Sequence, residues 1–549
     1  MLPSLESLSC HTGVLKGKQP ATELPPPVRL LGLDYWVHVL EQLDTEVSAC
    51  DDVVQMCKTL RLSGKDLGQE TPCDDAHFWE RMCQIRVFLF YSPEYVPIAS
   101  TSALDRWRKQ YLLFCRVAAV DPFHGHLNAL RTLGLTTTVP KEAFAYCHAL
   151  ALTHLPDGIT TIEEDAFAYC HALALTHLPQ GLTTIGNGAF QECHTLALTQ
   201  LPAGLTAIDE WAFCGCRALA LTQLPAGIVA IHDWAFKQCH SMALTQLPHG
   251  VTGIGQGAFQ ECHTLALTQL PERTTTIASF AFDHCKALAL TVLPAGVTAI
   301  NPGAFYQCNA LALTQLPQGV THIESDAFAH CHALALTQLP EGVVQIEEYA
   351  FMDCHSLALT QLPEGLTTIG EYAFRNCSAL ALTHLPHVLT VIEKGAFNDC
   401  SALALTHLPQ GLTRIESRAF MNCSALALTH LPDGVTSIDA QAFMNCHVLA
   451  LTQLPQRLTE IRMQTFRNCH AMPLTHLPEG LTRIESRAFV DCHALALTQL
   501  PPLLSHIGIR AFEFTTSRVE RLETQWHHRA HFTPQFPDSP SSPDDVESP

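Results

Sequence analysis

Residues 148–170 read HALALTHLPDGITTIEEDAFAYC, and the chain returns to this 23-residue pattern from about residue 130 to residue 515. Phe recurs at every 23rd position from Phe144 to Phe512, and Cys follows three places later in sixteen units. A fixed period of this size is typical of a solenoid, in which each unit buries its apolar side chains only against its neighbours. Such arrays usually provide a binding surface, so the period favours a binding protein over an enzyme.

Two short apolar segments are expected in each unit. The alternation Leu150-Ala-Leu152-Thr predicts a strand with its leucines inward and with Ala151 and Thr153 outward. Ile159 and the invariant Ile162 position form the second segment. Parallel stacking of such segments from coil to coil would build one continuous core.

Two turns are expected to connect these segments. Pro156 fixes φ at the first corner, and Gly158 closes that turn. Ala166-Phe167 and Cys170 lie three or four residues apart, which predicts one helical or 3₁₀ turn packing inward. Irregular first turns are expected wherever another residue replaces the glycine, at Arg273 (followed by Thr274), Val388, Arg457 and Leu503.

The unit L-x-L-x-x-L-P-x-G-[LIV]-x-x-I-x-x-x-A-F-x-x-C resembles the BspA-type subclass of leucine-rich repeats. The resemblance implies an α/β solenoid, a curved leucine-rich-repeat array over residues 127–515 with parallel strands along one face. We expect this array to be joined to a small helical N-terminal domain. In this family such arrays bind proteins.

Residues 27–125 are non-repetitive and contain four apolar stripes with helical spacing. We expect the preceding residues 1–26 to form a flexible leader. Cys57-Lys58, Trp79 and the segment 106–111 resemble an F-box. That resemblance implies docking to a ubiquitin-ligase adaptor of the Skp class, and the expected docking residues are Trp36, Val39, Leu40, Leu43, Val53 and Cys57. The alternative is that these helices only cap the first coil of the solenoid.

Composition limits the classes of partner. The chain has 31 basic and 52 acidic residues and a formal net charge of -21, which argues against a nucleic acid or an anionic membrane as the main partner. The N-terminal segment lacks the pattern of a secretory signal, and no apolar run is long enough to span a membrane. We therefore expect an intracellular, cytoplasmic protein whose 23 cysteines are thiols.

Histidine forms two columns in the repeat. One follows the repeated Cys, as at His148, and the Cys and His side chains should point in different directions, so no zinc site is expected. The other precedes Leu-Pro, where adjacent imidazoles would lower one another's pKa. The expected repeat-surface binding residues are Ala151, Thr153, His154, His177, Arg273, His384, His407 and His430. Asn422, Asn445 and Asn468 are expected to form a turn-stabilising ladder.

The C-terminal end predicts a helical cap over residues 516–531 and a disordered, acidic Pro/Ser tail over residues 532–549. No nucleophile-and-base constellation, phosphate-binding loop or paired-carboxylate motif is present, so we expect no catalytic residues and no cofactor.

The leading hypothesis is a protein-interaction module in which the array recruits a target and the N-terminal helices bind the ligase adaptor. The alternative is a leucine-rich-repeat scaffold or surface adhesin, in which those helices serve only as a cap.

Overall fold

The computed structural model describes residues 137–139, 141–146, 148, 150, 152–155 and 157–529. The chain divides into two compact units, Met1–Leu196 and Ala197–Pro549. The predicted leader (1–26), helical domain (27–125) and tail (532–549) lie outside the described residues.

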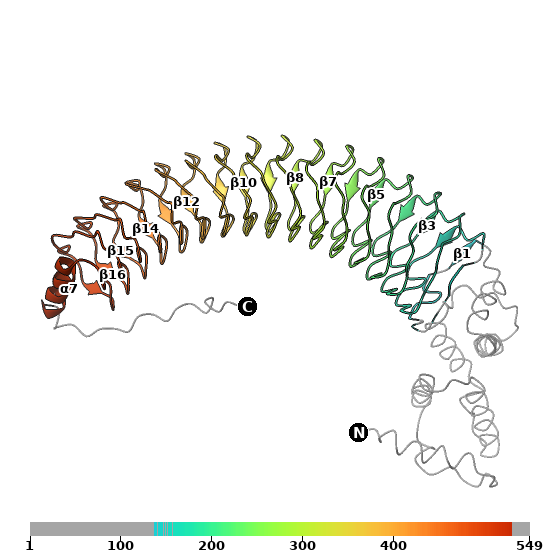
Figure 1. Ribbon diagram of the computed structural model, residues 1–549, viewed down its shortest axis with the longest axis horizontal. Coiled ribbons are helices and arrows are strands. Elements are labelled where there is room, and N and C mark those ends of the chain that lie inside the picture. The colour runs from blue at the N-terminus through green and yellow to red at the C-terminus, as the bar shows by residue number, and fades with distance from the viewer. Residues whose placement is uncertain are drawn as a thin grey trace, which may run out of the picture. The chain divides into compact units, whose positions relative to one another are not determined.

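The described residues form short parallel strands, one in each coil of a solenoid (Figure 1). In register, Ile162 pairs with Ile185 in the first unit, and Ile346 pairs with Ile369 in the second. The predicted parallel-strand solenoid is therefore confirmed, and the coils of the second unit follow an arc (Figure 1). The strands are β1 Thr138–Val139, β2 Thr161–Ile162, β3 Thr184–Ile185, β4 Ala207–Ile208, β5 Ala230–Ile231, β6 Gly253–Ile254, β7 Thr276–Ile277, β8 Ala299–Ile300, β9 His322–Ile323, β10 Gln345–Ile346, β11 Thr368–Ile369, β12 Val391–Ile392, β13 Arg414–Ile415, β14 Ser437–Ile438, β15 Glu460–Ile461, β16 Arg483–Ile484 and β17 His506–Ile507.

The regular strands coincide with the Ile162 segment of the repeat and not with the leucine segment. The leucine segment is extended, and it bonds to the preceding coil, as where the Ala174 amide donates to the Leu152 carbonyl at 3.1 Å. The Leu173 amide, however, donates to the Cys170 carbonyl of its own coil at 3.0 Å. Only some of the amides in the leucine segment therefore bond to the neighbouring coil, and no regular ladder forms. The inward leucines are confirmed, since Leu152 is fully buried. The prediction of a regular strand in this segment is wrong.

The segment around the repeated Phe forms two tight turns in place of a single helical turn. The second turn closes when the Cys170 amide donates to the Phe167 carbonyl at 3.2 Å. Asp165 and Tyr169 have φ of 51° and 60°, which interrupts helical geometry. The intervening amides then point at the next coil, as where Phe167 donates to the Ala189 carbonyl at 2.8 Å. The prediction of inward packing is confirmed, and the helical turn is replaced by these two turns.

The Phe side chains form a stacked column in each unit. In the first unit the ring centroids of Phe144, Phe167 and Phe190 are 5.1 and 5.4 Å apart. From Phe213 to Phe512 the separations are 5.3–5.7 Å, with nearly parallel rings. All of these side chains are buried. Burial of one such ring contributes roughly 1.5–3 kcal/mol, so the column is a main source of stability.

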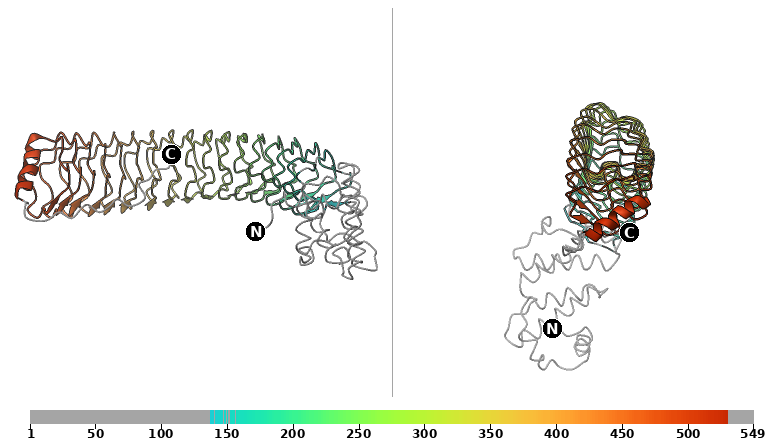
Figure 2. Two further views of the ribbon diagram at one scale, coloured as in Figure 1. Left: turned by 90° about the horizontal axis from the view of Figure 1, so that it is seen from below. Right: turned by 90° about the vertical axis from the view of Figure 1, so that its left-hand side faces the viewer.

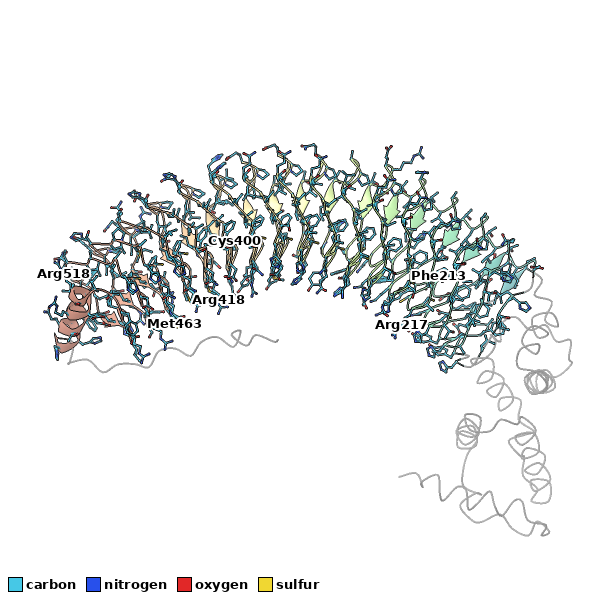
Figure 3. The ribbon with its side chains drawn as sticks, in the orientation of Figure 1. Phe213, Arg217, Cys400, Arg418, Met463 and Arg518 are labelled. Carbon is cyan, nitrogen blue, oxygen red and sulfur yellow. The ribbon has the colours of Figure 1, made fainter. Side chains whose placement is uncertain are left out.

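The cysteines form a second buried column beside the rings. The Cys193 thiol donates to the Phe167 carbonyl of the preceding coil at 3.1 Å, and the Cys400 thiol donates to Phe374 at 3.0 Å. Sixteen cysteines of the described residues are buried thiols outside any disulfide: fifteen belong to this column, from Cys170 to Cys492, and Cys214 lies beside it, so the predicted inward packing of the repeated Cys is confirmed for these coils. Burial raises the pKa of the thiols of this column from Cys239 to Cys492, that of Cys492 to about 12. Figure 3 shows Cys400 within the coils.

The Leu-Pro turn keeps its geometry where glycine is absent. The residue after the glycine position donates to the Pro carbonyl in a regular coil, as from Leu182 to Pro179 at 3.0 Å. The same bond forms in the coils of Arg273, Val388, Arg457 and Leu503, at 2.9–3.3 Å. A Cβ added at Gly365 would meet nothing within 4 Å, so this position has room for a side chain. The prediction of irregular turns at these four positions is wrong, because the turn needs no glycine there.

Helix α7, Ser517–Arg529, closes the C-terminal end of the array and lies within the range predicted for a helical cap (Figure 2). Val519 is fully buried. The Thr516 hydroxyl donates to the Leu495 carbonyl at 3.0 Å, and the Trp526 indole donates to the Leu504 carbonyl at 3.3 Å. These contacts fix the helix along the last coil.

Replacing Phe328 with Ala is expected to lower the free energy of unfolding by about 3–5 kcal/mol, because it opens a cavity between the rings of Phe305 and Phe351. Replacing the exposed Gln338 with Ala should change it by less than about 0.5 kcal/mol. Urea denaturation followed by circular dichroism measures both values. Equal effects of the two substitutions would contradict the packing described here.

Candidate functional site

The repeat exposes one polar face, which we call the threonine face. It consists of the Thr that ends each leucine segment, at every 23rd position from Thr153 to Thr498, and of the residue that follows it, which is His or Gln in every coil except the one with Val292. Thr153, His154 and His177 are exposed in the first unit. Ala151 lies outside the described residues, but the equivalent Ala174 is exposed. The outward orientation predicted for this row is confirmed.

Hydroxyl groups of the threonine face hold its histidines. The Thr176 hydroxyl donates to the Thr153 carbonyl at 3.2 Å, so toward His177 its oxygen acts as the acceptor of a hydrogen bond from Nδ1–H, with Nδ1 3.1 Å away. His177 Nε2 is then the nitrogen with a lone pair. In His384, His407 and His430, Nδ1 likewise lies 3.2, 2.9 and 2.9 Å from the preceding Thr hydroxyl.

Arg273 lies in a Leu-Pro turn and not on the threonine face. It is exposed, whereas the next residue, Thr274, is fully buried in the slot that other coils fill with an aliphatic side chain. The Thr274 hydroxyl donates to the Val251 carbonyl at 3.1 Å, which satisfies the buried polar group. The structure therefore separates Arg273 from the other expected binding residues.

Stacked imidazoles occur in the column that follows the repeated Cys, which we call the imidazole column. His148, His171 and His194 stack at 4.7 Å, and further stacks at 4.9–5.0 Å occur in the second unit. His171 Nδ1 donates to the Glu192 carbonyl at 3.0 Å. Burial, and then the neighbouring His263, lower the pKa of His240. Figure 3 shows Arg217, which takes the histidine position in its coil, at the edge of the coils.

The imidazole column and the thiol ladder do not share a centre. The ring planes of His148 and His171 differ by only 9°, so their Nε2 lone pairs run parallel and do not converge. The thiols are buried and donate to carbonyl oxygens. Across the described residues, no group of three or more His, Cys, Asp or Glu side chains could hold a metal ion.

Polar side chains form a ladder at the position with left-handed φ that lies two residues after the repeated Phe, in the second of the two tight turns. Asn445 Nδ2 donates to Asn422 Oδ1 at 2.6 Å, and Asn468 Nδ2 donates to Asn445 Oδ1 at 2.5 Å. All three asparagines have φ between 61° and 63°, a conformation that Asn tolerates well. The predicted turn-stabilising ladder is confirmed.

The same column contains a carboxylate that sequence reasoning missed. Asp353 accepts hydrogen bonds from Asn376 Nδ2 at 2.7 Å and from His330 Nδ1 at 3.0 Å. The hydrogen bond from His330 is the largest cause that lowers the pKa of Asp353. The sequence signal was the 23-residue spacing between His330, Asp353 and Asn376.

Aromatic pairs occupy the left-handed position two residues before the repeated Phe. Trp211 and Trp234 stack at 4.6 Å, and Tyr349 and Tyr372 stack at 5.5 Å. A Cβ at Gly395, which has φ of 57°, would overlap the Tyr372 ring, so this glycine is required to receive the ring. The sequence signal is a glycine one coil after an aromatic residue in this column, as at Trp234 and Gly257 and at Tyr372 and Gly395.

Two further expectations concern docking and membranes. The expected adaptor-binding residues Trp36, Val39, Leu40, Leu43, Val53 and Cys57 lie outside the described residues. In the part of the chain that the structure describes, no helix has the length and apolar character needed to cross a lipid bilayer.

Replacing Asp353 with Asn tests the polar column. Asn is chosen because it is the residue at the equivalent position one coil later, Asn376. The lowered pKa of Asp353 means that its stabilisation is fully present above its ordinary value of 3.8 and is lost as the pH falls through the folded-state pKa. We expect the substitution to cost about 0.5–1.5 kcal/mol near pH 6 and progressively less below pH 4. Urea denaturation across this range measures the effect, and a cost that does not change with pH would contradict it. Asp433→Asn, at an exposed turn, is the control.

A family model described as "BspA type Leucine rich repeat region (6 copies)" matches residues 137–266, 229–358, 322–449 and 413–525. No curated protein matches the chain.

Several solved structures are similar. A leucine-rich repeat protein from Bacteroides ovatus is 23% identical, with a TM-score of 0.44, over 62% of this chain and 84% of that one. A leucine rich cell surface protein from Faecalibacterium prausnitzii is 26% identical, with a TM-score of 0.35, over 60% and 87%. A leucine-rich repeat protein from T. pallidum is 30% identical, with a TM-score of 0.25, over 32% and 79%.

The family model covers well over half of the chain, and its matches span the coils whose Leu, Ile, Phe and Cys side chains the structure buries. The chain therefore belongs to the BspA-type leucine-rich repeat family.

Proposed function

We propose that the chain is a non-enzymatic scaffold that holds a protein partner against its repeat array. The proposal rests on the difference between the buried and the exposed positions of each coil. The Leu, Ile, Phe and Cys positions are buried and serve packing, whereas the threonine face is exposed in coil after coil. Exposed rows that packing does not require are available for recognition.

The chemistry of the buried groups supports a role without catalysis. Burial raises the pKa of the Cys239, Cys285 and Cys492 thiols, and a protonated thiol is a poor nucleophile. In the described coils the thiols instead donate hydrogen bonds to carbonyl groups of the neighbouring coil. Their role is structural.

Two kinds of contact are available to a partner. The threonine face offers hydroxyl, amide and imidazole groups at one coil spacing, and many weak contacts of this kind add up when they are engaged together. The half-buried rings of Trp211, Trp234 and Tyr349 offer larger apolar groups, whereas the Tyr372 ring on which Tyr349 stacks is buried. Arg375 and Lys394 lie 5.8 and 5.6 Å from the Tyr372 ring centroid. Trp, Tyr and Arg are the residues that most often dominate binding energy at interfaces.

A finer version of the proposal assigns a second docking site to residues 27–125. In that version the F-box-like segment binds an intracellular adaptor of the Skp class, and the array presents a target to a ubiquitin ligase. The alternative is a scaffold or surface adhesin, in which residues 27–125 only cap the array. Trp36 and Leu40 distinguish the two versions, because only adaptor docking requires them for partner recovery.

Affinity purification of the full chain with quantitative mass spectrometry tests the proposal. The triple variant H384Q/H407Q/H430Q introduces the Gln found in most other coils and should reduce recovery of the array's partner about tenfold, equivalent to ~1.4 kcal/mol. The control S378A/S401A/S424A changes a different row of the same three coils and should leave recovery unchanged. Failure to enrich any protein over an empty control, or equal recovery with both variants, would overturn the proposal. Recovery of a Skp-class adaptor that is lost on W36A/L40A supports the ligase version, and its absence removes only that version.

A further inference from the structure

The last described coil of the array exposes apolar side chains at positions that are polar in the coil before it. Ile509 is 72% exposed and Phe514 is 60% exposed. The equivalent residues 23 positions earlier are Ser486 and Asp491. Packing inside the array requires neither apolar side chain, because both project from it. Exposed apolar side chains gathered in one element indicate a surface that another group covers.

Two backbone amides of the same coil lack the acceptors that the repeat normally supplies. In the preceding coil the equivalent amides donate forward at 3.0 Å, as from Arg487 to the Ile509 carbonyl. In the part of the chain that the structure describes, the Arg510 and Phe514 amides have no such acceptor. We call Ile509, Arg510 and Phe514 the terminal surface. A group that covers it should supply carbonyl oxygens as well as apolar side chains.

Helix α7 replaces the missing coil only between these two amides. The Phe512 amide donates a hydrogen bond to the Glu523 carboxylate of α7. The Trp526 indole donates to the Leu504 carbonyl at 3.3 Å, which holds the last turns of the helix near the start of β17. Since α7 ends at Arg529, residues 530–549 leave the array beside its last coil.

We propose that residues 530–537 of the chain itself, AHFTPQFP, bind the terminal surface. Phe532 and Phe536 supply aromatic rings that can pack against its exposed apolar side chains. Pro534 and Pro537 each have a carbonyl acceptor and no amide donor. A proline-containing segment therefore matches a surface that has two amides without acceptors.

The charges of the two partners are complementary. Arg487 and Arg510 are exposed, and the closest carboxylate to Arg510 is that of Glu513, 3.7 Å from Nε. Arg487 forms no ion pair with any residue of the described chain. Residues 538–549 follow the proposed segment and contain four carboxylates and neither Lys nor Arg. Exposed ion pairs contribute little individually, so we expect the rings and the amides to dominate the binding.

The covalent connection favours this segment over a second copy of the chain. Leu504, which holds the end of α7, is five residues from Ile509, so the two lie at most about 18 Å apart. The seven residues from Arg529 to Phe536 can span up to about 24 Å. A segment on so short a connection has an effective concentration in the millimolar range, roughly a thousandfold above that of a second copy at micromolar concentration.

Chymotrypsin digestion of the full chain, followed by intact-mass spectrometry, tests the proposal at the Phe532–Thr533 bond. I509S/F514N introduces the residue types of Ser486 and Asn468 and should accelerate cleavage of this bond at least tenfold. The control V229T/V292Q changes two other exposed apolar residues to those of neighbouring coils and should leave the rate unchanged. Circular dichroism should give the same unfolding curve for all three proteins, because the replaced side chains are exposed. Equal cleavage rates in the wild type and I509S/F514N would overturn the proposal.

Hydrogen exchange followed by mass spectrometry examines the other side of the contact. F532S/F536S should raise the exchange rate in a peptide that spans residues 508–514 at least fivefold, whereas V546S, outside the segment, should not change it. An unchanged rate in F532S/F536S would contradict the proposal. Sedimentation equilibrium distinguishes a second copy. We expect the same mass for the wild type and I509S/F514N, and a wild-type dimer that dissociates in this variant would show that a second copy covers the surface instead.

Discussion

Each coil of the array is held to the next through the backbone of its repeated phenylalanine. The Phe167 amide donates forward to the Ala189 carbonyl, and its carbonyl accepts both the Cys170 amide and the Cys193 thiol. A buried turn with unpaired backbone groups would cost about 1–3 kcal/mol for each group. The left-handed residues on either side of Phe aim the amides at the neighbouring coil, which makes the whole column possible.

This constraint explains why the core is uniform and the surface is not. A solenoid is stabilised by contacts between neighbours, so every coil must present the same Phe, Cys, Leu and Ile to the next one. Positions that face water carry no such requirement. The Leu-Pro turn accepts Arg273 or Val388 in place of glycine, and one such turn brings His387 beside Glu364. Differences between coils therefore lie at positions that packing leaves free to vary.

The sequence predicted the features that depend on side-chain periodicity. The 23-residue period, the inward Leu152, the buried thiols and the Asn422 ladder all follow from which residue types recur at one spacing. The features it missed depend on backbone dihedral angles. Asp165 and Tyr169 adopt left-handed φ although neither is glycine, so a helical turn was predicted where two tight turns form.

In the candidate sites, too, some features follow from side-chain periodicity and others do not. The exposed Thr153 row could be predicted from alternation, because an extended backbone directs successive side chains to opposite sides even where no regular strand forms. The contacts of Glu364 with His384 and His387 join different coils and depend on rotamers, which no periodicity specifies. The pairing of Asp353 with His330 and Asn376 has the same origin. Spacing identified the columns, but not which members of a column touch.

The central claim is that the repeated Phe and Cys form a closed core inside every described coil. Counting reactive thiols on the native full chain tests it most directly, with a neutral thiol reagent at pH 7 and again in denaturant. The chain has 23 cysteines, of which 16 are buried and free in the described coils. The account predicts that at most the remaining 7 react quickly in the native protein and that all 23 react after unfolding. Rapid native reaction of clearly more than 7 thiols would contradict it.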